Sequence, residues 1–289
     1  METFQDRTAV VTGAASGIGR ALALALARRG MKLVLADIEP GPLGDAEKEI
    51  AATGAETLAV PTDVSSLPSV RALADQAFTR FGAVHVLCNN AGVAIGGALQ
   101  EARHEDWEWV LGVNLWGVIH GIEAFVPRMI EAKQGGHIVN TASMAGLIAS
   151  KGLGIYNTTK YAVVGLSETL AKDLRDDGIG VSVLCPMGVS TRIRESERNR
   201  PEALSGGSAA DSGASNSGAS NSGASNSGAS NSHGGPDLVG RYLPPEEIAA
   251  MAVEAIENGR LYIPTHYEGL EFWQRRATRI GESFPKPPA

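Results

Sequence analysis

Cysteine is scarce in this chain, with 2 among 289 residues. Cys88 and Cys185 each end an apolar run, a place where a thiol behaves as a small buried hydrophobe. Two such residues form neither a disulfide framework nor a cysteine metal cluster. We therefore expect two free buried thiols and no metal site.

Basic charge and long apolar runs are also lacking. Lys and Arg number 25 against 32 Asp and Glu, which gives a net charge of −7 and an isoelectric point near 5.4. The arginines from Arg192 to Arg200 are interleaved with Glu195 and Glu197, which is typical of a solvated helix and leaves no basic stripe for nucleic acid. No apolar stretch reaches the ~18 residues of a membrane span, and the polar opening 1–6 is unlike a signal peptide. We expect a cytoplasmic protein that binds neither nucleic acid nor membrane.

The chain does contain a regular alternation of short apolar runs with longer helix-forming runs. Near-continuous apolar runs are typical of strands that are buried on both faces of a parallel sheet. The alternation predicts an α/β fold: one doubly wound parallel sheet (Rossmann fold) with helices on both faces, as a single domain over residues 1–289. The expected strands are Ala9–Thr12, Lys32–Ala36, Glu56–Pro61, Val84–Asn89, Gly136–Thr141, Gly180–Pro186 and Leu261–Pro264, and the expected helices include Arg20–Arg29, Ser69–Phe81, Glu105–Val113, Trp116–Ala132, Tyr156–Asp176 and Pro245–Asn258.

A glycine-rich turn, from Gly13 to Gly19, joins the first strand to the first helix. Strand, glycine turn and helix in this order place backbone N–H groups and a helix dipole against a pyrophosphate. The spacing is G-x-x-x-G-x-G, which differs from the general G-x-G-x-x-G fingerprint. Taken alone, such a turn can also be purely structural.

An acidic residue ends the second strand. Asp37 stands 18 residues after Gly19, where a carboxylate can accept both hydroxyls of an adenosine ribose and would repel a 2′-phosphate. The next residue, Ile38, offers no phosphate clamp, so the pattern favours NAD over NADP unless Arg20 or another base reaches the site. A solvated loop acid or helix cap is the alternative for Asp37.

Tyr156 and Lys160 are four residues apart, and Ser143 lies 13 positions upstream of Tyr156. On a helix, positions i and i+4 share one face. A neighbouring ammonium favours the phenolate and lowers the pKa of a phenol from about 10 toward neutrality. The pair is therefore a candidate proton-transfer device, although an isolated Tyr-x-x-x-Lys more often marks an exposed helix face.

Together these motifs resemble the short-chain dehydrogenase/reductase family, over a span from about Arg7 to about Thr265. They stand in the family's order and spacing: Thr12–Gly19, Asp63-Val64, Asn89–Gly92, Asn114, Ser143, Tyr156 and Lys160. In the family, Asp63 would hydrogen-bond the adenine and residues 89–92 would shape the floor under the cofactor. The residues that the resemblance assigns to the cofactor are Gly13, Ser16, Gly17, Ile18, Gly19, Asp37, Asp63, Val64, Asn90, Ala91, Gly92, Tyr156, Lys160, Pro186, Gly188, Val189 and Thr191.

The resemblance also implies a catalytic tetrad of Asn114, Ser143, Tyr156 and Lys160. Tyr156 would be the general acid/base, Lys160 would lower its pKa and hold the nicotinamide ribose, Ser143 would position the substrate oxygen, and Asn114 would anchor a water. The implied function is hydride transfer between NAD(H) and a secondary alcohol or ketone. A non-catalytic dinucleotide-binding sensor is the alternative, and an epimerase or dehydratase that uses transient oxidation stays open.

The chain departs from the family pattern at Met187, where the family usually has glycine between Pro186 and Val189. This leaves the pocket wall at Met187 unsettled. A mostly apolar pocket is expected, which favours an apolar or aromatic alcohol and leaves sugars and steroids open. Its expected lining is Ala94–Gly97, Met144–Ile148, Leu153, Met187 and Ile193.

Residues 192–244 are an expected insertion at the family's substrate loop. Ser-Gly-Ala-Ser-Asn occurs four times from Ser212 to Asn231 and is followed by Ser232. This composition predicts a flexible segment, because it offers little apolar surface to bury. It is either a tolerated insertion, natural or engineered, or the slack centre of a lid whose flanks are Ile193–Leu204 and Leu238–Leu243.

Two helical regions bear on assembly. Trp116–Ala132 and Tyr156–Asp176 carry apolar residues on more than one face, and the family's matching pair forms a four-helix interface, so we expect a homo-oligomer, most simply a tetramer. The run Tyr267–Phe284, which contains Phe272 and Trp273, is predicted to pack on the core; capping the pocket or a subunit contact are its alternatives.

Overall fold

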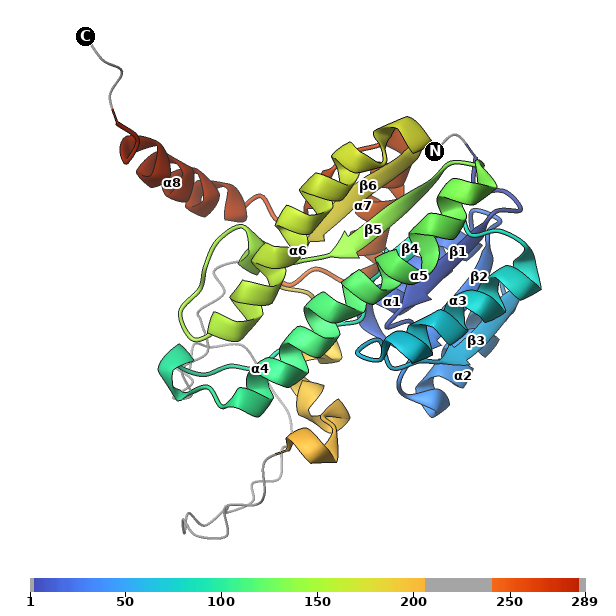
Figure 1. Cartoon of the computed structure of the whole chain (residues 1–289), viewed down its shortest axis with the longest axis horizontal. Helices are drawn as coiled ribbons and strands as arrows, with labels where there is room; N and C mark the ends of the chain where they lie inside the picture. The colour runs from blue at the N-terminus through green and yellow to red at the C-terminus, as the bar shows by residue number, and fades with distance from the viewer. Residues whose placement is uncertain (1–2, 206–240, 286–289) are drawn as a thin grey trace.

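The computed structural model describes residues 3–205 and 241–285 (Figure 1). Its centre is a seven-stranded parallel sheet in the order β3-β2-β1-β4-β5-β6-β7. The predicted doubly wound α/β fold is confirmed. The strands are β1 (Thr8–Thr12), β2 (Lys32–Asp37), β3 (Thr57–Pro61), β4 (Val86–Asn89), β5 (Gly136–Thr141), β6 (Ile179–Cys185) and β7 (Tyr262–Pro264).

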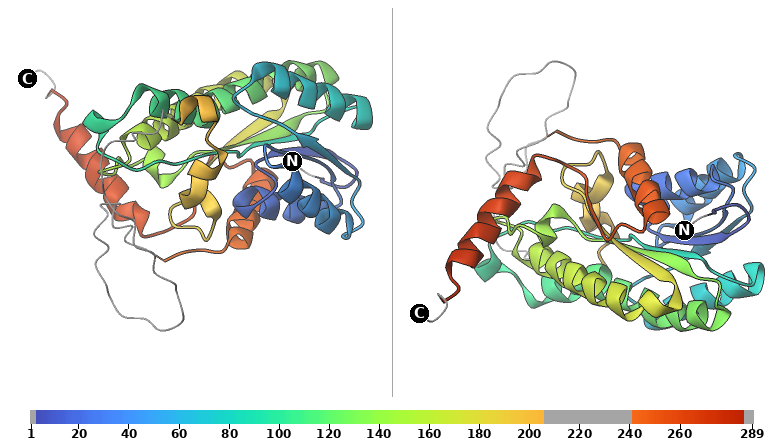
Figure 2. Two further views of the ribbon diagram at one scale, coloured as in Figure 1. Left: turned by 90° about the horizontal axis from the view of Figure 1, so that it is seen from below. Right: turned by 90° about the horizontal axis from the view of Figure 1, so that it is seen from above.

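Helices cover both faces of the sheet. Helices α1, α2 and α7 lie on one face, and α3, α4, α5 and α6 lie on the other (Figure 2). The bounds are α1 (Gly17–Ala27), α2 (Pro40–Ala51), α3 (Leu67–Phe81), α4 (His104–Leu111), α5 (Gly117–Ala132), α6 (Gly154–Asp173), α7 (Pro245–Asn258) and α8 (Gly269–Glu282).

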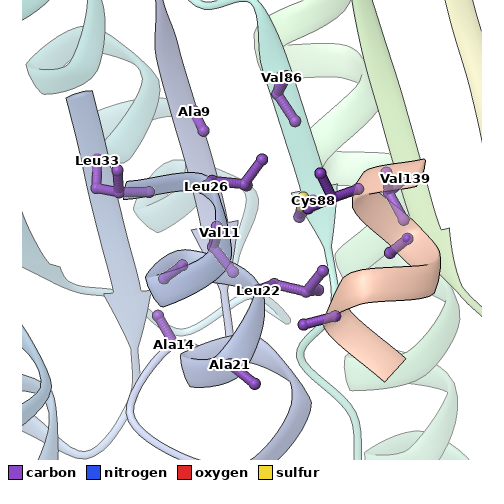
Figure 3. Packing of buried hydrophobic residues seen from close by; sticks show 14 of the residues in the cluster. Ala9, Val11, Ala14, Ala21, Leu22, Leu26, Leu33, Val86, Cys88 and Val139 are labelled. Atoms are coloured by element: carbon purple, nitrogen blue, oxygen red, sulfur yellow. The ribbon is translucent and has the colours of Figure 1, made fainter. Parts of the chain in front are cut away.

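The core on the α1 face shows why the strands are almost uniformly apolar. Leu22 and Leu26 of α1 are fully buried, and Figure 3 shows them beside Val11 of β1 and Cys88 of β4. Each such leucine contributes about 1.5–3 kcal/mol through burial. Packing of α1 against the sheet therefore keeps this face of the strands away from water.

Both cysteines are buried and free, as predicted. Burial raises the pKa of the Cys88 thiol to about 12, and that of the Cys185 thiol to about 12 as well, because a thiolate is poorly solvated there. They therefore stay protonated. Within 3–205 and 241–285, no cluster of three or more His, Cys, Asp or Glu side chains could hold a metal ion.

The two helices predicted as Glu105–Val113 and Trp116–Ala132 are one continuous helix. Helix α4 passes through a π turn, Gly112–Trp116, directly into α5. The whole segment His104–Ala132 is long and apolar enough by composition to cross a membrane, but 56% of its most apolar window is buried. Phe125 and Met129 pack in the core against α3 and the sheet, so packing within this fold accounts for its apolar character.

Two other helices depart from expectation. Helix α2 has no counterpart among the predicted helices. Its prolines and glycines disfavour a helix prediction, although Leu43, Ala46 and Ile50 form a short buried apolar stripe. Helix α8 was predicted to pack on the core, and this was wrong. Only Gly269 of α8 is buried, Leu270 is 56% exposed, and the helix leads away from the sheet (Figure 1).

The topology sets the place of the site. From β1 the chain builds outward to β2 and β3 on one side, and it returns to β4 on the other. Such a switch point opens a crevice at the carboxyl ends of the strands. The predicted flexible repeat 212–232 and residues 238–240 lie outside the described residues.

Candidate active site

The glycine turn after β1 is packed too closely for side chains. Gly13 has a φ of +67°, and a Cβ there would lie 2.9 Å from the Cα of Ala91. A Cβ on Gly19 would lie 2.0 Å from the Gly13 carbonyl oxygen. Helix α1 therefore starts against the turn. Ser16 is its N-cap, but the Ser16 side chain makes no capping hydrogen bond to the first turn of the helix. This cradle fits a pyrophosphate.

Thr12 joins the ends of β1 and β4. Its hydroxyl oxygen accepts hydrogen bonds from the backbone N–H groups of Asn90 (2.9 Å) and Ala91 (3.1 Å). The Asn90 side-chain Nδ2 donates back to the Thr12 carbonyl at 3.0 Å, and the Thr141 hydroxyl at the end of β5 donates to the side-chain Oδ1 of Asn90 at 3.2 Å. Three strand ends are thereby locked together as a floor.

Asp37 ends β2 beside this floor. Its carboxylate oxygens accept the N–H groups of Ala15 (3.0 Å) and Glu39 (3.1 Å), which orients the group. Burial raises the pKa of Asp37 above its usual value, and the two N–H donors act in the opposite direction. Each oxygen keeps a further lone pair for a ribose hydroxyl.

Asn114 stands in the π turn between α4 and α5 and is fully buried. Its side chain accepts from the Val93 N–H at 2.8 Å and donates to the Val93 carbonyl at 2.9 Å and to Thr159 at 3.2 Å. The residue therefore ties the loop after β4 to α6 instead of making a bond within its own helix. π turns often mark functional positions in helices.

Ser143, Tyr156 and Lys160 converge between β5, β6 and α6. The Ser143 hydroxyl donates to the Pro186 carbonyl at 3.2 Å and accepts from the Ala145 N–H at 3.1 Å, which fixes its direction. The Lys160 ammonium donates to the Thr141 carbonyl at 2.8 Å and lies 5.5 Å from the centroid of the Tyr156 ring. The predicted shared face of Tyr156 and Lys160 is present.

The charges at this centre differ from the sequence-based expectation. Burial raises the pKa of Tyr156, whereas we expected Lys160 to lower it; the Ser143 hydroxyl lowers it but does not outweigh burial. Burial also lowers the pKa of Lys160 to about 8. Both shifts follow from removing charge from water. The first proton to leave this centre is therefore that of Lys160, near pH 8, while the Tyr156 phenol keeps its own.

One cavity collects most of the predicted site residues. Among the expected residues that line it are Gly13, Ser16, Gly17, Ile18, Asp37, Asp63, Val64, Asn90, Ala91, Gly92, Ser143, Tyr156, Lys160, Pro186, Val189 and Thr191. Asn114 and Gly19 stand behind this lining, and Gly188 faces a neighbouring groove.

The expected apolar pocket is only partly present. Of its predicted members, Met187 and Ile193 line the cavity, while Ala94–Gly97, Met144–Ile148 and Leu153 are not among its lining residues. Trp109 and Val113 of the α4 region take their place, and sequence reasoning did not assign them. The sequence predicted a helix over Glu105–Val113 but did not indicate which of its faces meets the cavity.

Residues 192–204, called the strap below, form the other side of the cavity. The strap consists of the 3-10 helices η5 (Arg192–Asn199) and η6 (Glu202–Leu204) and lies near the carboxyl ends of the strands (Figure 2, gold). Ile193, Ser196, Arg198 and Asn199 line the cavity together with Glu39. The sequence carried no signal for these contacts, because they join segments far apart in the chain.

Comparisons with known proteins agree with this geometry. The family model described as short chain dehydrogenase matches residues 7–202. The chain belongs to the short-chain dehydrogenase family. A solved short-chain dehydrogenase/reductase from Burkholderia phymatum, in complex with NAD, is 41% identical with a TM-score of 0.83; the match covers 100% of this chain and 99% of that one.

Several curated relatives of this chain are dehydrogenases by name. A CLA biosynthesis dehydrogenase/reductase from Lactiplantibacillus plantarum is 34% identical over 97% of this chain and 95% of its own length. A 1-deoxy-11-beta-hydroxypentalenate dehydrogenase from Streptomyces avermitilis is 42% identical over 65% of this chain and 70% of its own length. The protein is thus an oxidoreductase of this family that uses a nicotinamide dinucleotide.

Proposed function

We propose that this protein is an NAD-dependent dehydrogenase of secondary alcohols, with ketone reduction as the reverse reaction. The observation that carries the proposal is the convergence of Ser143, Tyr156 and Lys160 on the same cavity as Asp37. A protein that only senses the dinucleotide has no use for a proton donor and a fixed hydroxyl at that place. A relative named for a hydroxy compound, 1-deoxy-11-beta-hydroxypentalenate, is in keeping with an alcohol substrate.

The residues divide the chemistry as follows. When bound, the nicotinamide accepts or supplies the hydride. Tyr156 takes the hydroxyl proton in alcohol oxidation and returns it in ketone reduction. Ser143, whose oxygen accepts from the Ala145 N–H, would turn its single hydroxyl proton from the Pro186 carbonyl to the substrate oxygen and hold that oxygen beside the Tyr156 phenol. Lys160, whose ammonium lies 5.5 Å from the centroid of the Tyr156 ring, favours the phenolate as long as it keeps its own proton.

Asn114 and Lys160 flank Gly92. A Cβ there would lie 3.4 Å from Asn114 Oδ1 and 3.6 Å from Lys160 Nζ, so glycine leaves the space between them open. A water in this space would hydrogen-bond both groups and pass protons from Lys160 toward solvent. This is the role proposed for Asn114, besides its bonds to Val93 and Thr159.

The preference for NAD rests on charge at the end of β2. A 2′-phosphate near Asp37 would also face Glu39, and Ile38 between them carries no charge. The arginines that line the cavity are already paired, Arg192 with Glu195 and Arg198 with Glu39. Calorimetric titration should show tighter binding of NAD(H) than of NADP(H), and tighter NADP(H) binding would reverse this assignment.

The pocket walls contributed by Trp109, Val113, Met187 and Ile193 favour an apolar or aromatic alcohol. The direct test supplies NAD⁺ and a panel of secondary alcohols, aromatic, aliphatic and polyhydroxylated, and follows the absorbance of the reduced nicotinamide. Turnover that is fastest with the apolar members supports the proposal. Tight NAD binding without turnover on any member would instead support the sensor alternative.

A further inference from the structure

The strap is joined to the β2 side of the cavity by one set of side-chain contacts. Arg198 Nη2 lies 3.0 Å from Glu39 Oε2, and Arg198 Nε lies 3.4 Å from Glu39 Oε1. The Asn199 side-chain amide donates to the same Glu39 carboxylate at 3.3 Å. Two segments 159 residues apart in sequence thus meet at Glu39.

This pair is better sheltered than a typical surface ion pair. The side chains of Arg198 and Glu39 are 25% and 21% exposed, compared with 46% and 40% for Arg20 and Glu49. Arg198 also donates through Nη1 to the carbonyls of Arg192 (3.2 Å) and Glu195 (3.0 Å), which closes η5 on itself. The hydrogen bonds from Arg198 lower the pKa of Glu39, so its carboxylate is charged at neutral pH.

Glu39 is also tied to the cofactor side of the cavity. Its backbone N–H donates to Oδ1 of Asp37, the carboxylate that the family resemblance assigns to the adenosine ribose. Both Glu39 and Arg198 line the cavity that contains Asp37. The contact therefore lies at the edge of the dinucleotide site, where the strap and the β2 turn meet.

The far side of the strap has separate anchors. The Ser196 hydroxyl accepts the Ala94 N–H at 3.1 Å. Arg200, whose side chain is 6% exposed, pairs with Asp106 of α4 and stacks 5.1 Å from the Trp109 ring centroid. With these anchors on the loop after β4 and on α4, the Glu39 contact ties the strap to the β2 side as well.

We propose that Glu39 and Arg198 form a latch that retains the dinucleotide, so that the cofactor leaves the cavity only after this pair separates. Both are positioning residues that act through the strap. The proposal rests on the nicotinamide dinucleotide cofactor described above. It adds that the rate at which the cofactor dissociates depends on a side-chain pair outside the catalytic residues and the glycine turn.

The test is stopped-flow displacement of NADH from the whole protein by excess NAD⁺, followed by nicotinamide fluorescence. Glu39→Gln and Arg198→Gln are each expected to raise the dissociation rate constant roughly three- to tenfold, as the loss of a charge-assisted bidentate contact predicts. The double variant should dissociate no faster than the single ones, because both remove one interaction. Arg198→Lys, which keeps the charge, should fall between wild type and Arg198→Gln.

Glu49→Gln is the matched control, because it breaks the exposed pair with Arg20 and Glu49 does not line the cavity. A second readout needs no cofactor: amide hydrogens of residues 192–204 should exchange faster in both latch variants than in wild type. Dissociation rates within twofold of wild type in either variant, or an equal change in Glu49→Gln, overturn the latch. Failure of the wild type to bind NADH would instead overturn the cofactor assignment.

Discussion

The two sides of the cofactor cavity are built by different means. The strand-end side is held by the parallel ladder, by the Thr12–Asn90 hydrogen bonds and by glycine packing at Gly13 and Gly19. Among the described residues the strap pairs with no strand of the sheet, and side chains such as Glu39 and Asp106 hold it in place.

This difference in construction suits the two sides to two tasks, proton transfer and cofactor retention. Groups that act on a proton must be placed within fractions of an ångström, and rigid elements do this better than loops. Short helices held by a few ion pairs open locally at lower free-energy cost. We therefore assign the chemistry to the strand-end side and α6, and cofactor retention to the strap.

The largest effect is expected for Tyr156→Phe. Removing the phenol oxygen from the strand-end side should lower kcat by about 10²–10⁴-fold, the usual value of general acid–base catalysis, and leave NADH affinity nearly unchanged. Tyr262→Phe is the matched control, because Tyr262 is 42% exposed and bonds Glu168. If Tyr156→Phe keeps more than about a tenth of wild-type turnover, another group is the acid/base.

Gly19→Ala disrupts the packing of the glycine turn on the strand-end side of the cavity. Its Cβ would lie 2.0 Å from the Gly13 carbonyl, so the turn must shift, at a cost of about 1–3 kcal/mol. We expect at least a tenfold loss of NAD affinity by calorimetry, together with a lower Tm. Gly165→Ala on α6 meets no atom within 4 Å and should instead stabilise by up to about 1 kcal/mol. Equal changes in NAD affinity and Tm in the two variants would contradict tight packing at the turn.

The pH dependence of turnover follows from the buried Tyr156–Lys160 pair. Lys160 has its pKa lowered to about 8, so the pair loses its first proton near that pH. Alcohol oxidation needs the deprotonated pair, and kcat/KM should therefore rise with pH and level off above about 8. Ketone reduction needs the proton, and its kcat/KM should fall over the same range. A flat profile for both directions between pH 6 and 9 would contradict proton transfer by this pair.

The smallest effect is expected for removal of α8. Gly269 is the one buried residue of this helix, and Arg276 contacts α6 at 5.2 Å from the Tyr161 ring centroid. Such a contact is worth about 0.5–1 kcal/mol at an exposed site. Deleting residues 269–289 should therefore lower Tm by no more than about 2–4 °C. Ile248→Ala in the buried face of α7 should cost about 2–5 kcal/mol, and a deletion that costs as much would contradict the exposed placement of α8.

The sequence predicts the strand-end side well for a physical reason. Apolar runs such as Thr8–Thr12 specify buried parallel strands, and the residues after them must then gather at one edge. Asp37 is expected at this edge for that reason, whereas Ser143 is predicted from its spacing to Tyr156 and from the family resemblance. The same reasoning misses the Glu39–Arg198 pair and Trp109. Their contacts join segments that are far apart in the sequence, and the local pattern of apolar residues does not predict such contacts. It also fails for α8, whose apolar residues suggest burial that the structure does not provide.

The most direct test of this division measures two rates in two variants side by side. Steady-state turnover and NADH dissociation are followed for Tyr156→Phe and Glu39→Gln under one set of conditions. The account predicts that Tyr156→Phe loses turnover by at least about 10²-fold with an unchanged dissociation rate. Glu39→Gln should keep the chemical step, measured in a single turnover, and release NADH several times faster. Variants that lose both properties together, or a Glu39→Gln enzyme that is impaired only in the chemical step, would contradict it.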